Sequence, residues 1–395
     1  MHRAEAGKRQ ATQWLWMGLA VGGIAPGLLL RLGLFGTSDP LAALIYGAAV
    51  VASAFLLSWA AEAAQVDFSQ GLALALLALI AILPEYVVDG TMAWLAATEP
   101  QYGGYAVANM TGANRLLVGI AWPLVVAIAF LRFGKREVRL EEGHGLELVV
   151  LLGASLYALV LPLTGNISLV DLVVLFAIFA FYMVRLAQLP AERPHLVGPA
   201  RLVGSLPPLP RRLLTAALGL VAAVAILLVA KPFAKALVAT GVSLGIDEFL
   251  LVQWLAPLAS EAPEFLVVAL FAWRGQSTPA FGTLVSSKIN QWTLLVGMLP
   301  LVYSIASGTP AALPLDERQR WEVVLTAAQS VYALILILDL QLHLLGATSL
   351  LGLFLVQLLW PDTRELMSSV YVVLTLVVLA RSWRRLGPAF RALRR

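Results

Sequence analysis

Two short stretches, LPEYVVD at residues 83–89 and SEAPE at residues 260–264, decide the fold of this chain. Each places a proline and carboxylates inside a long apolar run. A proline removes a helical hydrogen bond, and a carboxylate at membrane depth has no water to solvate it, so such residues are costly. The two Pro-Glu pairs fall in corresponding halves of the sequence, which predicts a binding site built from two interrupted helices.

The composition identifies the class of protein. Hydrophobic residues make up 60% of the 395 residues and charged residues 13%, whereas about 25% of the residues in soluble domains are charged. The bilayer admits only helices or closed barrels, and the alternation typical of barrel strands is absent. We therefore expect an all-α integral membrane protein. The chain has no cysteine, which excludes disulfides, thiol catalysis and zinc-thiolate sites.

Apolar runs of spanning length predict about twelve transmembrane helices. The basic residues of the short loops predict that both termini face the cytoplasm. The lack of cysteine and the short central loop favour the inner (plasma) membrane of a bacterium or archaeon. The predicted spans are 14–34, 40–64, 69–97, 104–131, 146–163, 168–187, 213–240, 247–273, 280–305, 321–338, 343–360 and 367–386.

The halves on either side of a basic, proline-rich segment resemble each other. ELVVLLGASLYAL at residues 147–159 aligns without a gap with EVVLTAAQSVYAL at residues 322–334. Each copy holds five spans, an odd number, so the second copy enters the membrane upside down relative to the first. We expect a core of two inverted five-helix repeats plus one extra helix at each end. The predicted segments are a cytoplasmic tail and extra helix (1–39), the first repeat (40–187), a basic cytoplasmic loop (188–212), the second repeat (213–360), and a helix with a basic tail (361–395).

A second pair of stretches follows the Pro-Glu pairs by about one span. These are NMTGANR at residues 109–115 and GTLVSSKINQ at residues 282–291. A carboxylate beside a helix break, facing a span rich in small and amide residues, supplies the oxygen ligands that a hard cation needs when it sheds water. The pattern predicts a site for sodium or calcium rather than for an apolar solute.

At these residues the chain resembles the cation/calcium exchanger superfamily, whose two alpha-repeats each carry a Thr-Ser-x-Pro-Glu type motif and a Gly-Ser-Asn type motif in the next helix. The resemblance implies an antiporter that exchanges calcium or sodium against sodium or protons. It implies that Glu85 and Glu264 form the central cation-binding pair near the bilayer midplane. The transported cations are then substrates, and no cofactor is expected. Further candidate ligands near the ion path are Ser260, Ser287, Asn290, Gln291 and Asn114.

The first repeat departs from the family pattern. Ala81 and Ile82 replace the hydroxyl pair before Pro-Glu, and Ala113 and Leu117 stand where the family has a serine and an amide or acid. In the second repeat, Lys288 replaces the asparagine that survives as Asn114 in the first. A four-site arrangement for sodium and calcium is therefore not assumed.

Two basic residues, Arg115 and Lys288, lie at membrane depth in the helices expected to face the glutamates. Asp89 lies four residues after Glu85, and Glu261 three before Glu264, so each acidic pair shares a helical face and joins the candidate site. One hypothesis pairs Arg115 with Asp89 or Glu85 and Lys288 with Glu261 or Glu264. A buried lysine can also release its proton, which would couple transport to protons. A purely structural ion pair explains these four residues equally well.

Several function classes are excluded or left open. No nucleophile with its base, no paired histidines and no phosphate-binding glycine loop is visible, so an enzyme is not expected. The four histidines form no ligand spacing and are assigned no role. The expected partners are the lipid bilayer and inorganic cations, with no nucleic acid and no obligate protein partner. A passive cation channel remains as an alternative because it could use the same acids. A transport-inactive ion-sensing homologue also remains, because the first repeat is poor in ligands.

Overall fold

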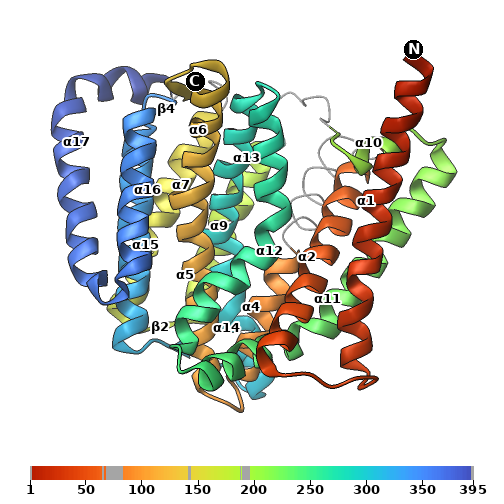
Figure 1. Ribbon diagram of the computed structural model, residues 1–395. Coiled ribbons are helices and arrows are strands. Elements are labelled where there is room, and N and C mark those ends of the chain that lie inside the picture. Colours follow the sequence, from red (N-terminus) through yellow and green to blue (C-terminus); the bar gives the residue numbers. More distant parts are fainter. Residues whose placement is uncertain are drawn as a thin grey trace. The chain divides into compact units, whose positions relative to one another are not determined.

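The computed structural model describes residues 2–64, 66–67, 83–140, 144–186, 188 and 196–392. Almost all of these residues are helical (Figure 1). The chain forms two units, one of Met1–Thr91 with Met183–Pro263 and the other of Met92–Tyr182 with Glu264–Arg395. Each unit therefore combines segments from both halves of the sequence.

The first unit is held together by small residues that let its helices approach closely. Helix α2 packs against α1 and α11, and a β-carbon added at Gly27 of α1 would lie 2.6 Å from the β-carbon of Ala49 on α2. Leu56, Trp59 and Leu218 are among the buried side chains of its core. Its elements are α1 (His2–Arg31), α2 (Asp39–Ala64), most of α4 (Leu83–Leu95), α10 (Pro199–Gly204), α11 (Pro208–Leu244) and the first part of α12 (Glu248–Trp273).

The second unit combines elements from two separate stretches of the chain. From the first half of the sequence come α5 (Gln101–Leu116), η1 (Leu117–Ala121), α6 (Trp122–Phe133), β1 (Glu137–Arg139), α7 (Gly145–Tyr157), α8 (Val160–Thr164), β2 (Asn166–Ile167) and most of α9 (Leu169–Leu186). After the end of α12 come α13 (Ser277–Asn290), η3 (Gln291–Leu295), α14 (Val296–Ser307), β3 (Leu313–Pro314), α15 (Glu317–Leu336), β4 (Gln341–His343), α16 (Leu344–Leu359), η4 (Pro361–Thr363) and α17 (Arg364–Ala392).

The described residues contain eight helices long and apolar enough to cross a membrane, or nine if two bent pieces of α12, Glu248–Ala262 and Glu264–Trp273, form one span. Helix α16 is apolar but shorter, and α15 coincides with the span predicted at 321–338. This pattern confirms the all-α membrane fold and is consistent with about twelve helices. The start of the span predicted at 69–97, with Ala81 and Ile82, and part of the predicted loop 188–212 lie outside the described residues.

Two short β-ladders within the second unit confirm that the repeats are inverted. The strand before α7, β1, pairs with the strand after α15, β4, so that Val138 lies opposite Leu342. The strand after α8, β2, pairs with the strand before α15, β3, so that Ile167 lies opposite Leu313. The strand that precedes the fourth helix of one repeat therefore pairs with the strand that follows the fourth helix of the other, at both ends of the unit (Figure 1). The helices between these strands must run in opposite directions.

The long helices of the repeats in this unit change their winding at equivalent places. Residues Leu117–Ala121 join α5 to α6 as a π-helix, and residues Gln291–Leu295 join α13 to α14 in the same way. A π-turn widens the helix and shifts its hydrogen bonds, and such turns are frequent at functional sites. Within the described residues, one π-helix thus begins two residues after segment 109–115, and the other begins at the last residue of segment 282–291.

Candidate functional site

The candidate residues are divided between the two units. Glu85, Asp89, Ser260 and Glu261 belong to the first unit, and all four are buried. The hydroxyl of Ser260 donates to the backbone oxygens of Ala256 and Pro257, both at 3.2 Å, so its lone pairs remain available to a ligand. The second unit holds Glu264, Asn114, Arg115, Ser287, Lys288, Asn290 and Gln291.

Within the second unit, the structure brings Glu264 and Ser287 together. The Ser287 hydroxyl donates to the carboxylate Oε2 of Glu264 at 3.0 Å. The other oxygen, Oε1, is buried and accepts no hydrogen bond from the described residues. A carboxylate that has an unengaged buried oxygen is suited to bind either a proton or a cation, because burial without a partner is costly for the ionised group. Both residues were candidate cation ligands in the sequence, and their role as ligands stays a prediction.

Lys288 and Asn114 occupy equivalent positions in the two repeats, and they meet. The ammonium Nζ of Lys288 donates to the Asn114 side-chain Oδ1 at 2.7 Å and to its backbone oxygen at 2.8 Å. Both residues are buried, and the Asn114 amide nitrogen donates to the backbone oxygen of Met110 at 3.0 Å. The Lys288 Nζ therefore occupies two oxygens of the kind that coordinate a hard cation.

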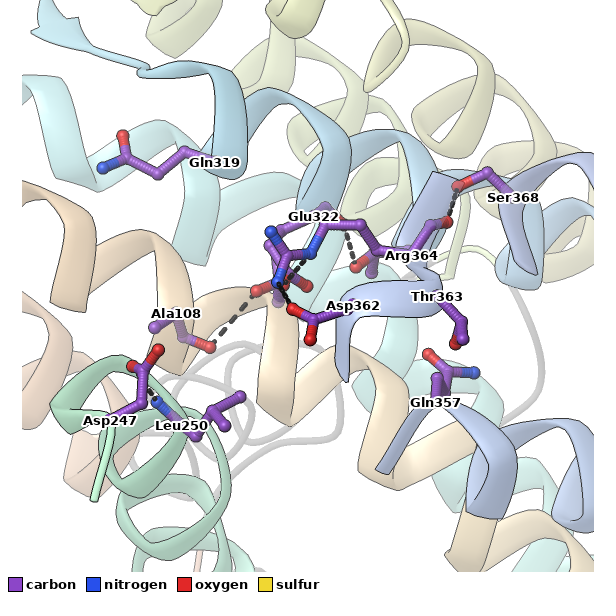
Figure 2. A network of polar contacts seen from close by, with 12 residues as sticks. Ala108, Asp247, Leu250, Gln319, Glu322, Gln357, Asp362, Thr363, Arg364 and Ser368 are labelled. Atoms are coloured by element: carbon purple, nitrogen blue, oxygen red, sulfur yellow. Dashed lines mark hydrogen bonds and ion pairs between the residues drawn. The ribbon is translucent and has the colours of Figure 1, made fainter. Parts of the chain in front are cut away.

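Arg115 has a partner that the sequence analysis did not name. Its guanidinium lies 2.5 Å from the carboxylate of Glu322 on α15 and donates to the side-chain oxygen of Gln357 on α16 at 3.1 Å. Arg364, at the start of α17, lies 3.5 Å from the same carboxylate and extends toward Asp362 (Figure 2). Arg115 and Glu322 are both buried. This pair links the middle helix of the first repeat to the second repeat and to the extra C-terminal helix.

Glu147 on α7 is the residue equivalent to Glu322, and it too is buried among polar groups. Its Oε1 accepts from the Tyr182 hydroxyl at 3.1 Å and from the Ser286 hydroxyl at 2.9 Å, and its Oε2 contacts Nδ1 of His144. Sequence reasoning used Glu147 only as evidence of duplication and assigned nothing to His144. The indication available in the sequence was that Glu147 and Glu322 occupy the same position in the ungapped alignment of segments 147–159 and 322–334.

Asn290 and Gln291 lie where α13 passes into the π-helix η3. Both side chains are buried, and Gln291 is the first residue of η3, as Leu117 is of η1. Only the second repeat therefore has an amide at this position. Among the described residues, no group of three or more histidine, aspartate or glutamate side chains is arranged to hold a metal ion.

The profile of one protein family matches both halves of the chain. This family is described as "Sodium/calcium exchanger protein", and the match covers residues 40–187 and 214–361. The chain belongs to the sodium/calcium exchanger family. As a member of the cation/calcium exchanger superfamily, the exchanger is a multi-pass membrane protein. Among curated proteins, none matches its sequence.

Solved structures with the same fold agree with this membership. The exchanger is 41% identical to the H⁺/Ca²⁺ exchanger CAX, with a TM-score of 0.92 over 98% of each chain. It resembles YfkE at 13% identity with a TM-score of 0.64, covering 90% of this chain and 99% of that one. It resembles the sodium-calcium exchanger NCX_Mj at 16% identity with a TM-score of 0.51, covering 87% and 99% of the two chains. The last two likenesses concern the fold alone.

Proposed function

We propose that this exchanger transports Ca²⁺ across the membrane in exchange for H⁺. Its family carries out cation antiport, and the solved structure to which it is 41% identical over 98% of both chains is that of an H⁺/Ca²⁺ exchanger. That likeness, which extends over nearly the whole chain, is the observation that carries the proposal. Sodium-coupled exchange is supported by fold likeness only, through NCX_Mj at 16% identity.

Glu264 is the residue that would bind the two ions in turn. Its Oε1 is buried and accepts no hydrogen bond from the described part of the chain, while Ser287 supports Oε2. A protonated carboxyl group cannot neutralise a divalent cation, and a carboxylate bound to Ca²⁺ cannot hold a proton. The two ions therefore compete for one group, which is the requirement for obligatory exchange. Glu85, buried in the first unit, is the second carboxylate proposed for the same task.

The remaining ligands would come from neutral oxygens. Calcium takes six to eight oxygen ligands at about 2.3–2.6 Å, and carboxylates, hydroxyls, amides and backbone carbonyls all serve. We assign this part to Ser287, Asn290 and Gln291 in the second unit and to Ser260 in the first. Asp89 and Glu261, both buried in the first unit, would add negative charge near the glutamates. The π-helix that starts at Gln291 shifts the backbone hydrogen bonds beside these side chains.

The contact between Lys288 and Asn114 favours protons over sodium as the counter-ion. The ammonium takes up the Oδ1 and backbone oxygens of Asn114, which would otherwise suit a monovalent cation. With Leu117 in the place of an amide or acid, the first repeat offers few further side-chain oxygens to sodium. The exchanger needs no cofactor and no covalent step, so we do not propose an enzymatic activity.

Isotope uptake into proteoliposomes tests the proposal. We expect a pH gradient to drive ⁴⁵Ca²⁺ uptake by the purified exchanger, and a sodium gradient at equal pH to drive none. Glu264→Gln keeps the size of the side chain but removes its charge, and it should abolish the gradient-driven uptake. Uptake down the calcium gradient alone, with no counter-ion movement, would instead indicate a channel. No uptake under any gradient would indicate a transport-inactive homologue.

A further inference from the structure

The duplicated glutamates Glu147 and Glu322 lie in equivalent surroundings within the second unit. Tyr182 donates to Glu147, and Gln357 bonds to Arg115, the partner of Glu322. Tyr182 and Gln357 are themselves separated by the same spacing along the sequence as the two glutamates. Each glutamate also contacts the middle helix of the opposite repeat: Glu147 bonds to α13, and Glu322 bonds to α5. Each repeat thus contains one buried glutamate in an equivalent site.

The two sites differ in the base that faces the carboxylate. Glu322 faces two guanidinium groups, those of Arg115 and Arg364, and arginine keeps its charge at every physiological pH. Glu147 faces the imidazole of His144, which gains and loses a proton near neutral pH. The carboxylate of Glu322 is therefore paired with arginines, whereas that of Glu147 is paired with a histidine, the side chain most used to pass protons.

The Glu147 site adjoins the group proposed to bind calcium. Ser286 donates to Glu147 Oε1 at 2.9 Å, and the next residue along α13, Ser287, donates to Glu264 Oε2 at 3.0 Å. A hydroxyl both donates and accepts, so it can release one proton as it receives another. The two serines are adjacent in sequence, and a water molecule between their hydroxyls would complete the hydrogen-bonded chain from Glu264 to Glu147.

His144 connects this site to solvent. Its side chain is 24% exposed, whereas that of Glu147 is 6% exposed. The ring lies against Gly282 of α13, where an added β-carbon would come within 2.7 Å of the ring carbon Cε1. Glycine at this position therefore makes room for the imidazole, one helical turn before Ser286 on the same helix face. His144 directly precedes α7, at the end of the unit where β1 pairs with β4 (Figure 1).

We propose that His144 and Glu147 form a proton relay between Glu264 and the solvent at this end of the second unit. When Ca²⁺ displaces the proton of Glu264, the O–H bond breaks and the proton passes through the Ser287 and Ser286 hydroxyls to the Glu147 carboxylate. An N–H bond then forms at His144 Nδ1, and the ring returns its Nε2 proton to water. The reverse sequence loads Glu264. The relay rests on the proposed exchange of calcium for protons.

The other charged groups around the relay are engaged elsewhere. On α13, the Lys288 ammonium is bonded to Asn114, and on α15, Glu322 is paired with Arg115. On α9, the polar group that faces Glu147 is the neutral hydroxyl of Tyr182. Of the described residues bonded to Glu147, His144 is thus the titratable base that can accept its proton.

The experiment compares two modes of transport by the full chain in proteoliposomes. Uptake of ⁴⁵Ca²⁺ driven by a pH gradient requires net proton movement, whereas exchange of ⁴⁵Ca²⁺ for unlabelled Ca²⁺ at equal pH does not. We expect His144→Ala and Glu147→Gln to slow the first mode roughly tenfold to a hundredfold, and to leave the second within about twofold of wild type. Added imidazole should restore the first mode in His144→Ala, because the site of the ring opens to solvent.

His343→Ala is the matched control. His343 also contacts a glutamate, with Nδ1 3.2 Å from Glu137, but it is half exposed and its glutamate lies on β1 rather than beside α13 Ser286. It should leave both modes unchanged. The relay is refuted if the His144 and Glu147 variants keep the proton-driven rate, or if both modes fall equally, which would indicate a structural role. If wild type shows calcium exchange but no uptake driven by a pH gradient, the proposed function itself fails, and the relay fails with it.

Discussion

Lys288 is the residue that most sharply separates this chain from a sodium-binding arrangement. Its ammonium holds the Oδ1 and backbone oxygens of Asn114, its equivalent in the other repeat, at 2.7 and 2.8 Å. A cation that is part of the chain cannot leave with the substrate. We infer that it lowers the number of free ions that the protein can carry, and that proton loss from this lysine would couple transport to pH.

Replacing Lys288 with alanine should make transport sensitive to sodium. The substitution frees both Asn114 oxygens, which sodium can then bind, so we expect Na⁺ to inhibit Ca²⁺ uptake in Lys288→Ala but not in wild type. We also expect the pH dependence of uptake to shift. The measurement is the initial rate of uptake at several pH values with and without NaCl. Lys231→Ala, which removes an exposed lysine of α11, serves as the control. An unaltered pH profile together with no response to sodium would exclude this role.

The π-helix η1 is an element whose position depends on one small residue. A β-carbon at Gly119 would lie 2.4 Å from Cγ of Phe354 on α16, so the helix and the aromatic ring already touch. Both groups are buried in the second unit. The widened turn is thus fixed by packing, and the geometry beside Asn114 and Arg115 depends on it.

Gly119→Ala should destabilise the exchanger by about 1–3 kcal/mol, because the added methyl group overpacks a filled interface. The effect is measured as a fall in the thermal unfolding temperature of the purified protein in detergent. Gly153→Ala on α7 is the control, since its β-carbon would meet nothing within 4 Å and alanine favours a helix. Equal stability of the two variants would show that η1 has room to move.

The turn after α2 is joined to the start of α11 by an ion pair that responds to pH. Hydrogen bonds from Arg211 lower the pKa of the Asp67 carboxyl to about 2. The contact is bidentate, with both nitrogen-to-oxygen distances at 2.7 Å, and Arg212 adds a third bond at 2.9 Å. The side chains of Asp67 and Arg211 are 9% and 13% exposed, so solvent screens their attraction only in part.

This ion pair should stabilise the first unit at neutral pH and not in acid. The pKa of Asp67 is lower in the folded state than its unfolded value of about 3.9, so the contribution is complete above about pH 4 and is lost as the pH falls toward 2. We expect Asp67→Asn to lower the unfolding temperature at pH 7, with a smaller difference from wild type at pH 3. Asp362→Asn removes a fully exposed carboxylate and should change neither value. A difference independent of pH would contradict the assignment.

In the whole molecule, features that repeat along the sequence were predictable, and contacts between distant residues were not. Apolar run length located the helices, and the match between segments 147–159 and 322–334 predicted the inverted repeats that the β-ladders display. Helix α15 begins with a polar turn, residues 317–320, before the predicted span 321–338. Helix α16 has only 16 residues, and composition alone therefore locates these two helices less clearly than the others.

Predictions for single residues were limited by contacts between segments far apart in the sequence. The motifs identified Glu264 and Ser287, which the structure joins by a hydrogen bond. The predicted acidic partners of Arg115 came from its nearest motif, whereas the structure adds Glu322, 207 residues away along the chain. His144 could not be predicted from spacing, because its partners Glu147 and Gly282 meet only through the packing of α7 on α13. The π-helices were missed because no residue type marks them.

The central claim is that a proton and a calcium ion compete for the Glu264 carboxylate, and proton release on calcium binding tests it most directly. Titration calorimetry of the detergent-solubilised exchanger, in two buffers of different ionisation enthalpy, measures how many protons leave for each Ca²⁺ bound. We predict about one proton or more for wild type, and neither tight binding nor proton release for Glu264→Gln. Calcium binding without proton release in wild type, or unchanged binding and release in Glu264→Gln, would contradict the account.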